Sequence, residues 1–132
     1  MNDDQHARVA CEQLLEAFYN RVDRGQGAGT LPLFHPNGSM RAGGQVLQNL
    51  DEVAVAMRAR DSDTSRRTAH RIGLFDFTRN GDHALAAGNL SVHIYSAPDA
   101  NTPDATFQYE TEFALDDERQ WRILAITVSA NN

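Results

Sequence analysis

The chain has 132 residues, of which 41% are hydrophobic and 23% charged, as is typical of one compact domain spanning residues 1–132. A formal net charge of -6 argues against a generic nucleic-acid binder and against attachment to an anionic membrane through basic residues. No apolar run approaches the length of a membrane span, the N-terminus does not resemble a signal peptide, and the single cysteine, Cys11, suits a reducing compartment. We therefore expect a cytoplasmic protein.

Two helices are predicted in the first half of the chain. Residues 4–24 carry apolar side chains at spacings of three and four, and glycines at 25, 27 and 29 end this helix. Asn49 and Glu52 have the spacing of a capping box, so we expect the second helix to begin at Asn49 and to end between residues 61 and 65. Between the helices we predict a helical turn (30–34), a turn (35–38) and two short strands (39–47).

Beyond residue 65 the apolar residues recur with a period of about two, which predicts strands. Helices followed by antiparallel strands indicate an α+β domain whose sheet curls against the helices. Residues 96–104 are expected to form an exposed loop. The predicted strands cover residues 68–78, 84–95, 106–115 and 121–129.

The Asn80-Gly81 pair is a strong signal for a hairpin turn and allows the pairing of the first two of these strands to be predicted. If Arg79 pairs with Asp82, one face of the hairpin is largely apolar and the other is polar, since side chains alternate along a strand. A bulge in either strand would break this inference. His70 then lies opposite Ser91 and Thr68 opposite His93, and the polar face consists of Thr68, His70, Asn89, Ser91, His93 and Tyr95.

The polar face has two interpretations. It is either a solvated or dimer-facing surface of the sheet, or the wall of a pocket in which imidazoles transfer protons near neutral pH. Tyr19 and Asp23 share one face of the first helix and are either residues at the edge of its apolar stripe or residues that look into a cavity. Asp23 lies near the helix C-terminus, where the macrodipole disfavours a negative charge, and this local conflict hints at another role for the carboxylate.

The sequence gives little support to a metal or cofactor site. The histidines lack His-x-His spacing, and no Cys-x-x-Cys motif is present. The glycines between residues 25 and 29 do not lie between a strand and a helix, as a phosphate-binding loop requires. We expect neither a metal nor a cofactor, and we expect Cys11 to be a small core residue.

The order of elements and several motifs resemble the nuclear-transport-factor-2-like superfamily, specifically its SnoaL-like branch. This resemblance implies a cone-shaped α+β barrel, in which a strongly bent antiparallel sheet wraps around a pocket closed by helices. Members are often dimers through the sheet, so a homodimer is expected. The matching segments are Phe18-Tyr19 with Asp23, residues 33–38, the helix 49–60, residues 67–70 and residues 121–123.

The layout of the site is similar to that of scytalone dehydratase and the bile-acid dehydratases. These enzymes have a Thr-x-His strand motif, here Thr68-Ala69-His70, and an Asp late in the first helix, here Asp23. Scytalone dehydratase has a second His on the next strand, here His93, and a Tyr two residues on, here Tyr95. It also has a Tyr just before the Asp; this chain has Val22 there, and Tyr19 lies one turn earlier.

The resemblance implies a cofactor-independent dehydratase, isomerase or cyclase that acts by acid–base chemistry on a small organic molecule. His70 would be the general base or acid, Asp23 would orient it, and Tyr19 and His93 would donate hydrogen bonds to a carbonyl or a held water. Thr68, Asn89, Ser91 and Tyr95 would line the pocket. The alternatives are a non-catalytic module that binds a small ligand, a dimeric accessory protein of the same fold, or a structural subunit of a larger oxygenase.

Overall fold

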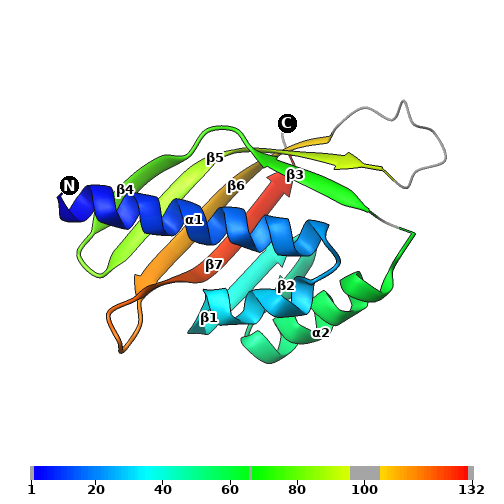
Figure 1. Ribbon diagram of the computed structural model, residues 1–132, viewed down its shortest axis with the longest axis horizontal. Coiled ribbons are helices and arrows are strands. Elements are labelled where there is room, and N and C mark those ends of the chain that lie inside the picture. The colour runs from blue at the N-terminus through cyan, green and yellow to red at the C-terminus, as the bar shows by residue number, and fades with distance from the viewer. Residues whose placement is uncertain (1, 66, 96–104, 131–132) are drawn as a thin grey trace.

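A computed structural model describes residues 2–65, 67–95 and 105–130 of the chain (Figure 1). The helices precede most of the strands, as predicted, whereas the predicted loop 96–104 lies outside the described residues. In chain order the elements are α1 (Asp3–Asp23), the 3-10 helix η1 (Gly27–Leu33), β1 (Phe34–Ala42), β2 (Gln45–Leu47), α2 (Leu50–Ser62), β3 (Thr68–Ile72), β4 (Asp76–Asn80), β5 (His83–Ile94), β6 (Ala105–Leu115) and β7 (Trp121–Ala130).

Both α-helices begin at an asparagine cap. The Asn2 side chain accepts a hydrogen bond from the Gln5 backbone N–H (2.8 Å), and the Gln5 side chain accepts one from the Asn2 N–H (2.9 Å), which completes a capping box. Asn49 caps α2 as predicted and accepts from the Glu52 N–H (2.9 Å). The Glu52 carboxylate accepts from the Gln48 N–H instead of completing a capping box at Asn49.

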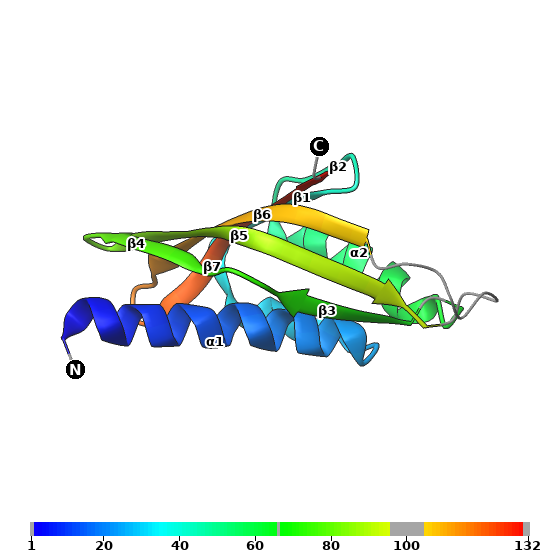
Figure 2. The ribbon, with the colours of Figure 1, turned by 90° about the horizontal axis from the view of Figure 1, so that it is seen from above.

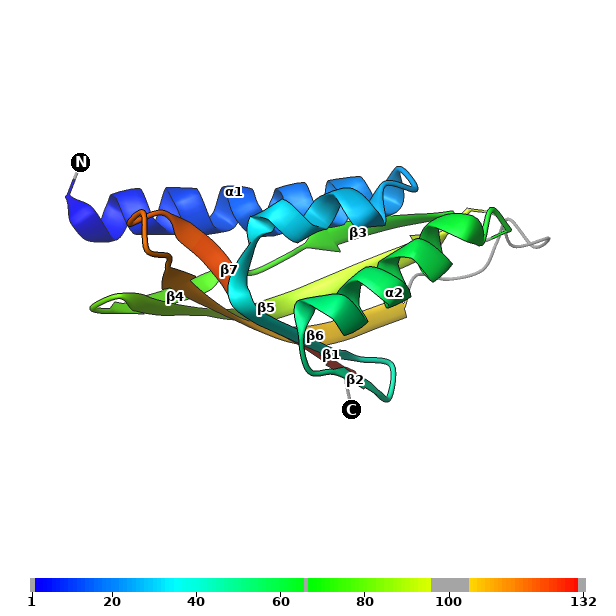
Figure 3. The same cartoon turned by 90° about the horizontal axis from the view of Figure 1, so that it is seen from below.

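The strands form one strongly curved sheet that stays open, with the order β2-β1-β7-β6-β5-β3 and with β4 also paired to β5. Only the β1–β7 pair is parallel among the pairs described. Helix α1 lies across one face of the sheet, and η1 and α2 lie beside it (Figures 2 and 3). The predicted α+β class with a bent sheet packed on N-terminal helices is therefore confirmed.

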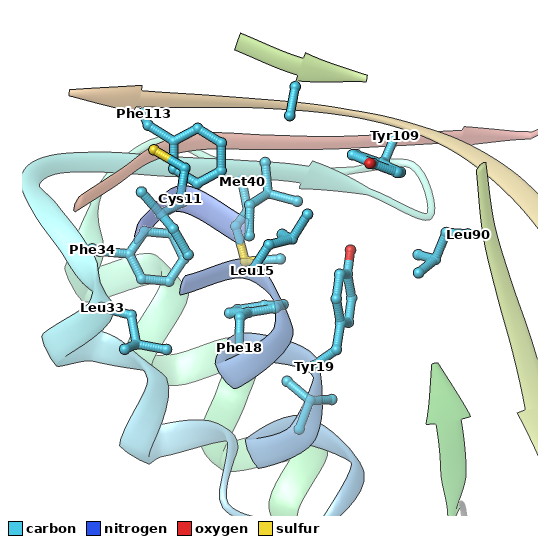
Figure 4. Packing of buried hydrophobic residues seen from close by; sticks show 14 of the residues in the cluster. Cys11, Leu15, Phe18, Tyr19, Leu33, Phe34, Met40, Leu90, Tyr109 and Phe113 are labelled. Atoms are coloured by element: carbon cyan, nitrogen blue, oxygen red, sulfur yellow. The ribbon is translucent and has the colours of Figure 1, made fainter. Parts of the chain in front are cut away.

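The hydrophobic core lies between α1 and the inner face of the sheet. Leu15 and Phe18 of α1 pack in one buried cluster with Phe34 of β1 and Phe113 of β6 (Figure 4). Cys11 is fully buried in the same cluster, which confirms it as a core residue. The apolar stripe of α1 thus supplies one wall of the core and leaves the C-terminal part of the helix beside the cavity described below.

Two predictions about turns are wrong. The turn predicted at residues 35–38 belongs to β1, where the pairing with β7 is irregular between Phe34 and Ser39. The β4–β5 hairpin closes between Asn80 and His83 instead of between Arg79 and Asp82. The second error alone leaves the two faces of the hairpin unchanged, because it moves the pairing by two residues.

A β-bulge divides the strand predicted at residues 68–78 into β3 and β4. Here the three residues 73–75 face only Gly88 and Asn89 of β5. The Leu74 carbonyl lies so close to Gly88 that a Cβ at residue 88 would overlap its oxygen. That oxygen accepts a hydrogen bond from the Tyr109 hydroxyl (2.5 Å). The missing side chain at residue 88 and the hydroxyl on β6 therefore hold the bulge in place.

Because of the bulge, the side chains of β3 lie on the opposite faces of the sheet from those predicted, and the predicted polar face is wrong. His70 pairs with Val92, and Thr68 pairs with Ile94. Because side chains alternate, Thr68 and His70 share the inner face of the sheet with the apolar residues of β5. The residues Asn89, Ser91 and His93 lie on the opposite face, so the predicted grouping of the two imidazoles is wrong.

Candidate active site

A cavity of about 660 Å³ lies between the C-terminal half of α1, α2 and the inner face of the sheet. Most of its wall is apolar, with Phe18 and Val22 from α1, Met57 from α2, and Leu90 and Val92 from β5. Polar side chains interrupt this wall, mostly where α1 and α2 end beside β3, with Gln45 on β2 as the exception. The polar lining residues are Tyr19, Gln45, Arg60, Asp63, Thr68 and His70.

Asp23, the last residue of α1, is joined to His70 of β3 by both carboxylate oxygens. Its Oδ1 lies 2.5 Å from His70 Nδ1, and its Oδ2 accepts a hydrogen bond from the His70 backbone N–H (2.8 Å). Strand β3 is at the edge of the sheet, and this N–H points away from β5. The carboxylate therefore satisfies an edge-strand donor and orients the imidazole at the same time.

Thr68 and Arg60 extend the hydrogen-bonded chain beyond the carboxylate. The Thr68 hydroxyl donates to Asp23 Oδ1 (2.9 Å), and Arg60 Nη2 donates to Thr68 Oγ1 (2.9 Å). Thr68 is buried at the start of β3, and Arg60 lies in the last turn of α2. Side chains from α1, β3 and α2 therefore form one hydrogen-bonded chain beside the cavity.

The pKa of Asp23 lies below the ordinary value of an aspartate. Burial by itself raises this pKa, but the side-chain and backbone hydrogen bonds of His70, its charge and the Thr68 hydroxyl together outweigh burial. A carboxylate can only accept hydrogen bonds, so His70 Nδ1 carries the proton that it shares with Asp23. In the neutral form of the imidazole the other ring nitrogen, Nε2, carries the lone pair, and the side chain lines the cavity.

Tyr19 packs on the imidazole from the α1 side. The rings of Tyr19 and His70 are stacked, with centroids 4.7 Å apart and planes inclined by 23°. Figure 4 shows the Tyr19 side chain pointing from α1 toward the sheet. Burial raises the Tyr19 pKa above its ordinary value, and the nearby Tyr109 and Asp23 raise it further. Tyr19 therefore keeps its hydroxyl proton at neutral pH.

The structure thus brings together half of the eight residues that the sequence nominated. Tyr19, Asp23, Thr68 and His70 converge, whereas the other four do not line this cavity. Asn89 borders a separate hollow of about 450 Å³ on the opposite face of the sheet. Ser91 and His93 lie on that face as well, and Tyr95 follows β5 with 61% of its surface exposed.

Arg60 was missed by the sequence analysis. It lies three residues after Met57, a member of the apolar stripe of α2, so helical spacing places the two on one face. This three-residue spacing from Met57 was the sequence signal that could have placed Arg60 on the inner face of the helix. The contact with Thr68 could not be inferred, because it depends on how the end of α2 meets the start of β3.

Two features are absent from the part of the chain that the structure describes, namely a cluster of metal ligands and a membrane-spanning helix. Over residues 2–65, 67–95 and 105–130, no three His, Cys, Asp or Glu side chains are grouped so that they could hold a metal ion. Within the same ranges, none of the helices combines the length and hydropathy needed to cross a membrane.

The comparisons with known proteins agree with the fold. The SnoaL-like domain family matches residues 3–127. A proposed dehydratase of the NTF2-like family from Streptomyces avermitilis has a TM-score of 0.83 at 15% identity and covers 97% of this chain and 98% of its own. A proposed scytalone dehydratase from Novosphingobium aromaticivorans has a TM-score of 0.81 at 14% identity over 100% of this chain and 89% of its own.

An NTF2-like superfamily protein from Salmonella enterica is similar over 97% of this chain and 93% of its own, with a TM-score of 0.82 at 11% identity. Identities this low show a shared fold and nothing finer. Among curated proteins, none matches the sequence significantly. Because the family match spans nearly the whole chain, this protein belongs to the SnoaL-like domain family.

Proposed function

We propose that this protein is a cofactor-independent enzyme that transfers protons at a carbon next to a carbonyl in a small, largely apolar molecule. The reaction would be a dehydration, an isomerisation or a cyclisation through an enol. The observation that carries this proposal is the Asp23–His70 pair, with Oδ1 and Nδ1 2.5 Å apart, at the rim of a mostly apolar cavity. The cavity volume of about 660 Å³ is in the range that holds drug-sized molecules.

The proposed chemistry uses a neutral His70 with its proton on Nδ1, an ionised Asp23 and a protonated Tyr19. His70 Nε2 would remove a proton from the carbon next to the carbonyl, and the Asp23 carboxylate would stabilise the imidazolium that forms. The Tyr19 hydroxyl would donate a hydrogen bond to the carbonyl oxygen as negative charge develops there. In a dehydration, the imidazolium then returns its proton to the departing hydroxyl, which leaves as water. His93 has no part in this scheme, because it lies on the opposite face of the sheet.

The first step can be tested before the natural substrate is known. Cyclic and aromatic ketones that bind the protein, identified by chemical-shift changes in its NMR spectrum, would be incubated with it in D2O. Replacement of the hydrogen next to the carbonyl by deuterium is then followed by proton NMR. We expect His70→Ala to slow this exchange by about 10²- to 10⁴-fold, as for the loss of a general base. His93→Ala is the matched control and should stay within about threefold of wild type.

The outcomes separate an enzyme from a binding module. If a ketone occupies the cavity but exchanges at the same rate with wild type and His70→Ala, the enzyme proposal is wrong. The mostly apolar cavity would then favour a module that holds a small ligand without turning it over.

We also propose that two copies associate through the outer face of the sheet, as the family resemblance implies. Val46 of β2 and Leu85 of β5 lie on this face and are 51% and 41% exposed. Analytical ultracentrifugation should give twice the mass of one chain, and Leu85→Glu should shift the protein toward the monomer. A wild-type monomer at all concentrations would contradict this proposal.

A further inference from the structure

We infer that Arg60 is a positioning residue that fixes the direction of the hydrogen bonds at Asp23 and, through them, the protonation of the Asp23–His70 pair. The importance of this role for catalysis rests on the proposed function, whereas the role itself is a property of the ligand-free protein. Arg60 acts through the hydroxyl of Thr68, which lies between the guanidinium and the carboxylate.

The direction follows from counting protons. A guanidinium has only donors, so at 2.9 Å it must donate to Thr68 Oγ1. A threonine hydroxyl has a single proton, and that proton is then available only for the other neighbour, Asp23 Oδ1, which also lies 2.9 Å away. Without Arg60 the hydroxyl could turn its single proton away from the carboxylate, toward solvent in the cavity that Thr68 lines. The arginine therefore removes the alternative orientation.

The orientation of the Thr68 hydroxyl also affects which nitrogen of the His70 imidazole carries a proton. With the hydroxyl held, Asp23 accepts three hydrogen bonds, from Thr68, from the His70 backbone N–H and from His70 Nδ1. Three donors stabilise the anion, and the anion in turn keeps the imidazole proton on Nδ1. Among the described residues that line the cavity, the ionisable groups are Tyr19, Arg60, Asp63 and His70. Of these, His70 binds the Asp23 carboxylate directly, and Arg60 reaches it through the Thr68 hydroxyl.

The Asp23 pKa should rise when either Thr68 or Arg60 is replaced. Thr68→Val removes the hydroxyl without changing the size of the side chain and should raise this pKa by about one unit, since hydrogen bonds to charged groups are among the stronger ones. Arg60→Met should also raise it, and the double variant should raise it no further than Thr68→Val alone. The pKa shifts caused by two substitutions do not add when both residues act through one shared proton. Thr68→Ser keeps a hydroxyl and should restore the wild-type value.

The experiment is a pH titration of the ligand-free protein by NMR. The ¹³C shift of the Asp23 carboxyl reports its pKa, and the ¹⁵N shifts of the His70 ring report which nitrogen carries the proton. Arg58→Met is the matched control, because Arg58 is an exposed arginine of the same helix and its loss removes the same charge. Arg60→Lys keeps the charge and is the second variant should Arg60→Met fold poorly; with a shorter reach to Thr68, it should raise the pKa partway.

The expected result is a shift in Arg60→Met that exceeds the shift in Arg58→Met and disappears in the Thr68→Val background. Additive shifts, or equal shifts in the two arginine variants, would show that Arg60 acts only through its charge and would overturn the inference. No substrate enters this measurement. If the ketone-exchange test fails while the Arg60 and Thr68 variants show the expected non-additive pKa shifts, the proposed function is refuted. The positioning role of Arg60 then stays intact.

Discussion

Asp23→Asn is the substitution that tests the geometry of the site most directly, because it keeps the shape of the side chain and removes its charge. The carboxylate accepts three hydrogen bonds, two at Oδ1 and one at Oδ2. An amide has one oxygen and one NH₂ group, so it can keep the two bonds at its oxygen at most. The NH₂ group would then face the His70 backbone N–H, and two donors would meet.

The magnitude follows from these three bonds. A hydrogen bond to a charged group contributes about 1.5–3 kcal/mol and a neutral one about 1 kcal/mol. Asp23→Asn loses one charged bond and weakens two others, which gives about 3 kcal/mol. The side chains of His70 and Asp23 are 14% and 17% exposed, and screening by solvent reduces this figure to about 2 kcal/mol.

Urea unfolding at pH 7, followed by the fluorescence of the single tryptophan, Trp121, measures this loss. With an m-value of about 2 kcal/mol/M, a loss of 2 kcal/mol lowers the midpoint by about 1 M. Glu16→Gln, at an exposed position of the same helix, is the control and should leave the midpoint unchanged. Equal midpoints for wild type and Asp23→Asn would mean that the contacts at Asp23 contribute nothing to stability, and the reasoning would be refuted.

The difference in folding stability between wild type and Asp23→Asn should depend on pH. The Asp23 pKa is lower in the folded protein than in the unfolded chain, so the folded state binds fewer protons. Its contribution to stability is therefore present above the unfolded pKa of about 3.9 and is lost as the pH falls through the folded pKa. Wild type should exceed Asp23→Asn in stability at pH 5, and the difference should shrink below about pH 4. A difference that grows toward acid pH would contradict the assigned direction.

Three further predictions concern the bulge and the core. Gly88→Ala should destabilise the protein by more than about 2 kcal/mol in urea unfolding, because the new Cβ overlaps the Leu74 carbonyl; Gly29→Ala, where a Cβ meets nothing within 4 Å, is the control. Tyr109→Phe removes the hydrogen bond to the same carbonyl and should cost about 1 kcal/mol, so an unchanged midpoint would count against its role in the bulge. Burial raises the pKa of the Cys11 thiol to about 12, so a thiol reagent should label it at least about 10²-fold more slowly in the native protein than in urea; equal rates would argue against its burial.

Local patterns in the sequence were sufficient for most of the architecture. The period of the apolar residues identified α1 and α2, and Asn49 placed the start of the second helix correctly. These features depend on neighbours three or four residues apart, so they can be recognised without the tertiary structure. Asp23 and His70 were nominated for the same site, and the structure brings them together. The unfavourable position of Asp23 at a helix C-terminus is offset by three donors from β3.

What the sequence by itself determined was the helix and strand content, the α+β class and the residue types available for acid–base chemistry. Only the tertiary structure decided which side of the sheet His70 and His93 occupy. One extra residue on a strand reverses every side chain beyond it. That residue is accommodated because the Leu74 backbone meets Gly88 and the Tyr109 hydroxyl, which belong to two other strands. Three segments far apart in the chain must meet to create this contact, so no local pattern around any one of them contains it.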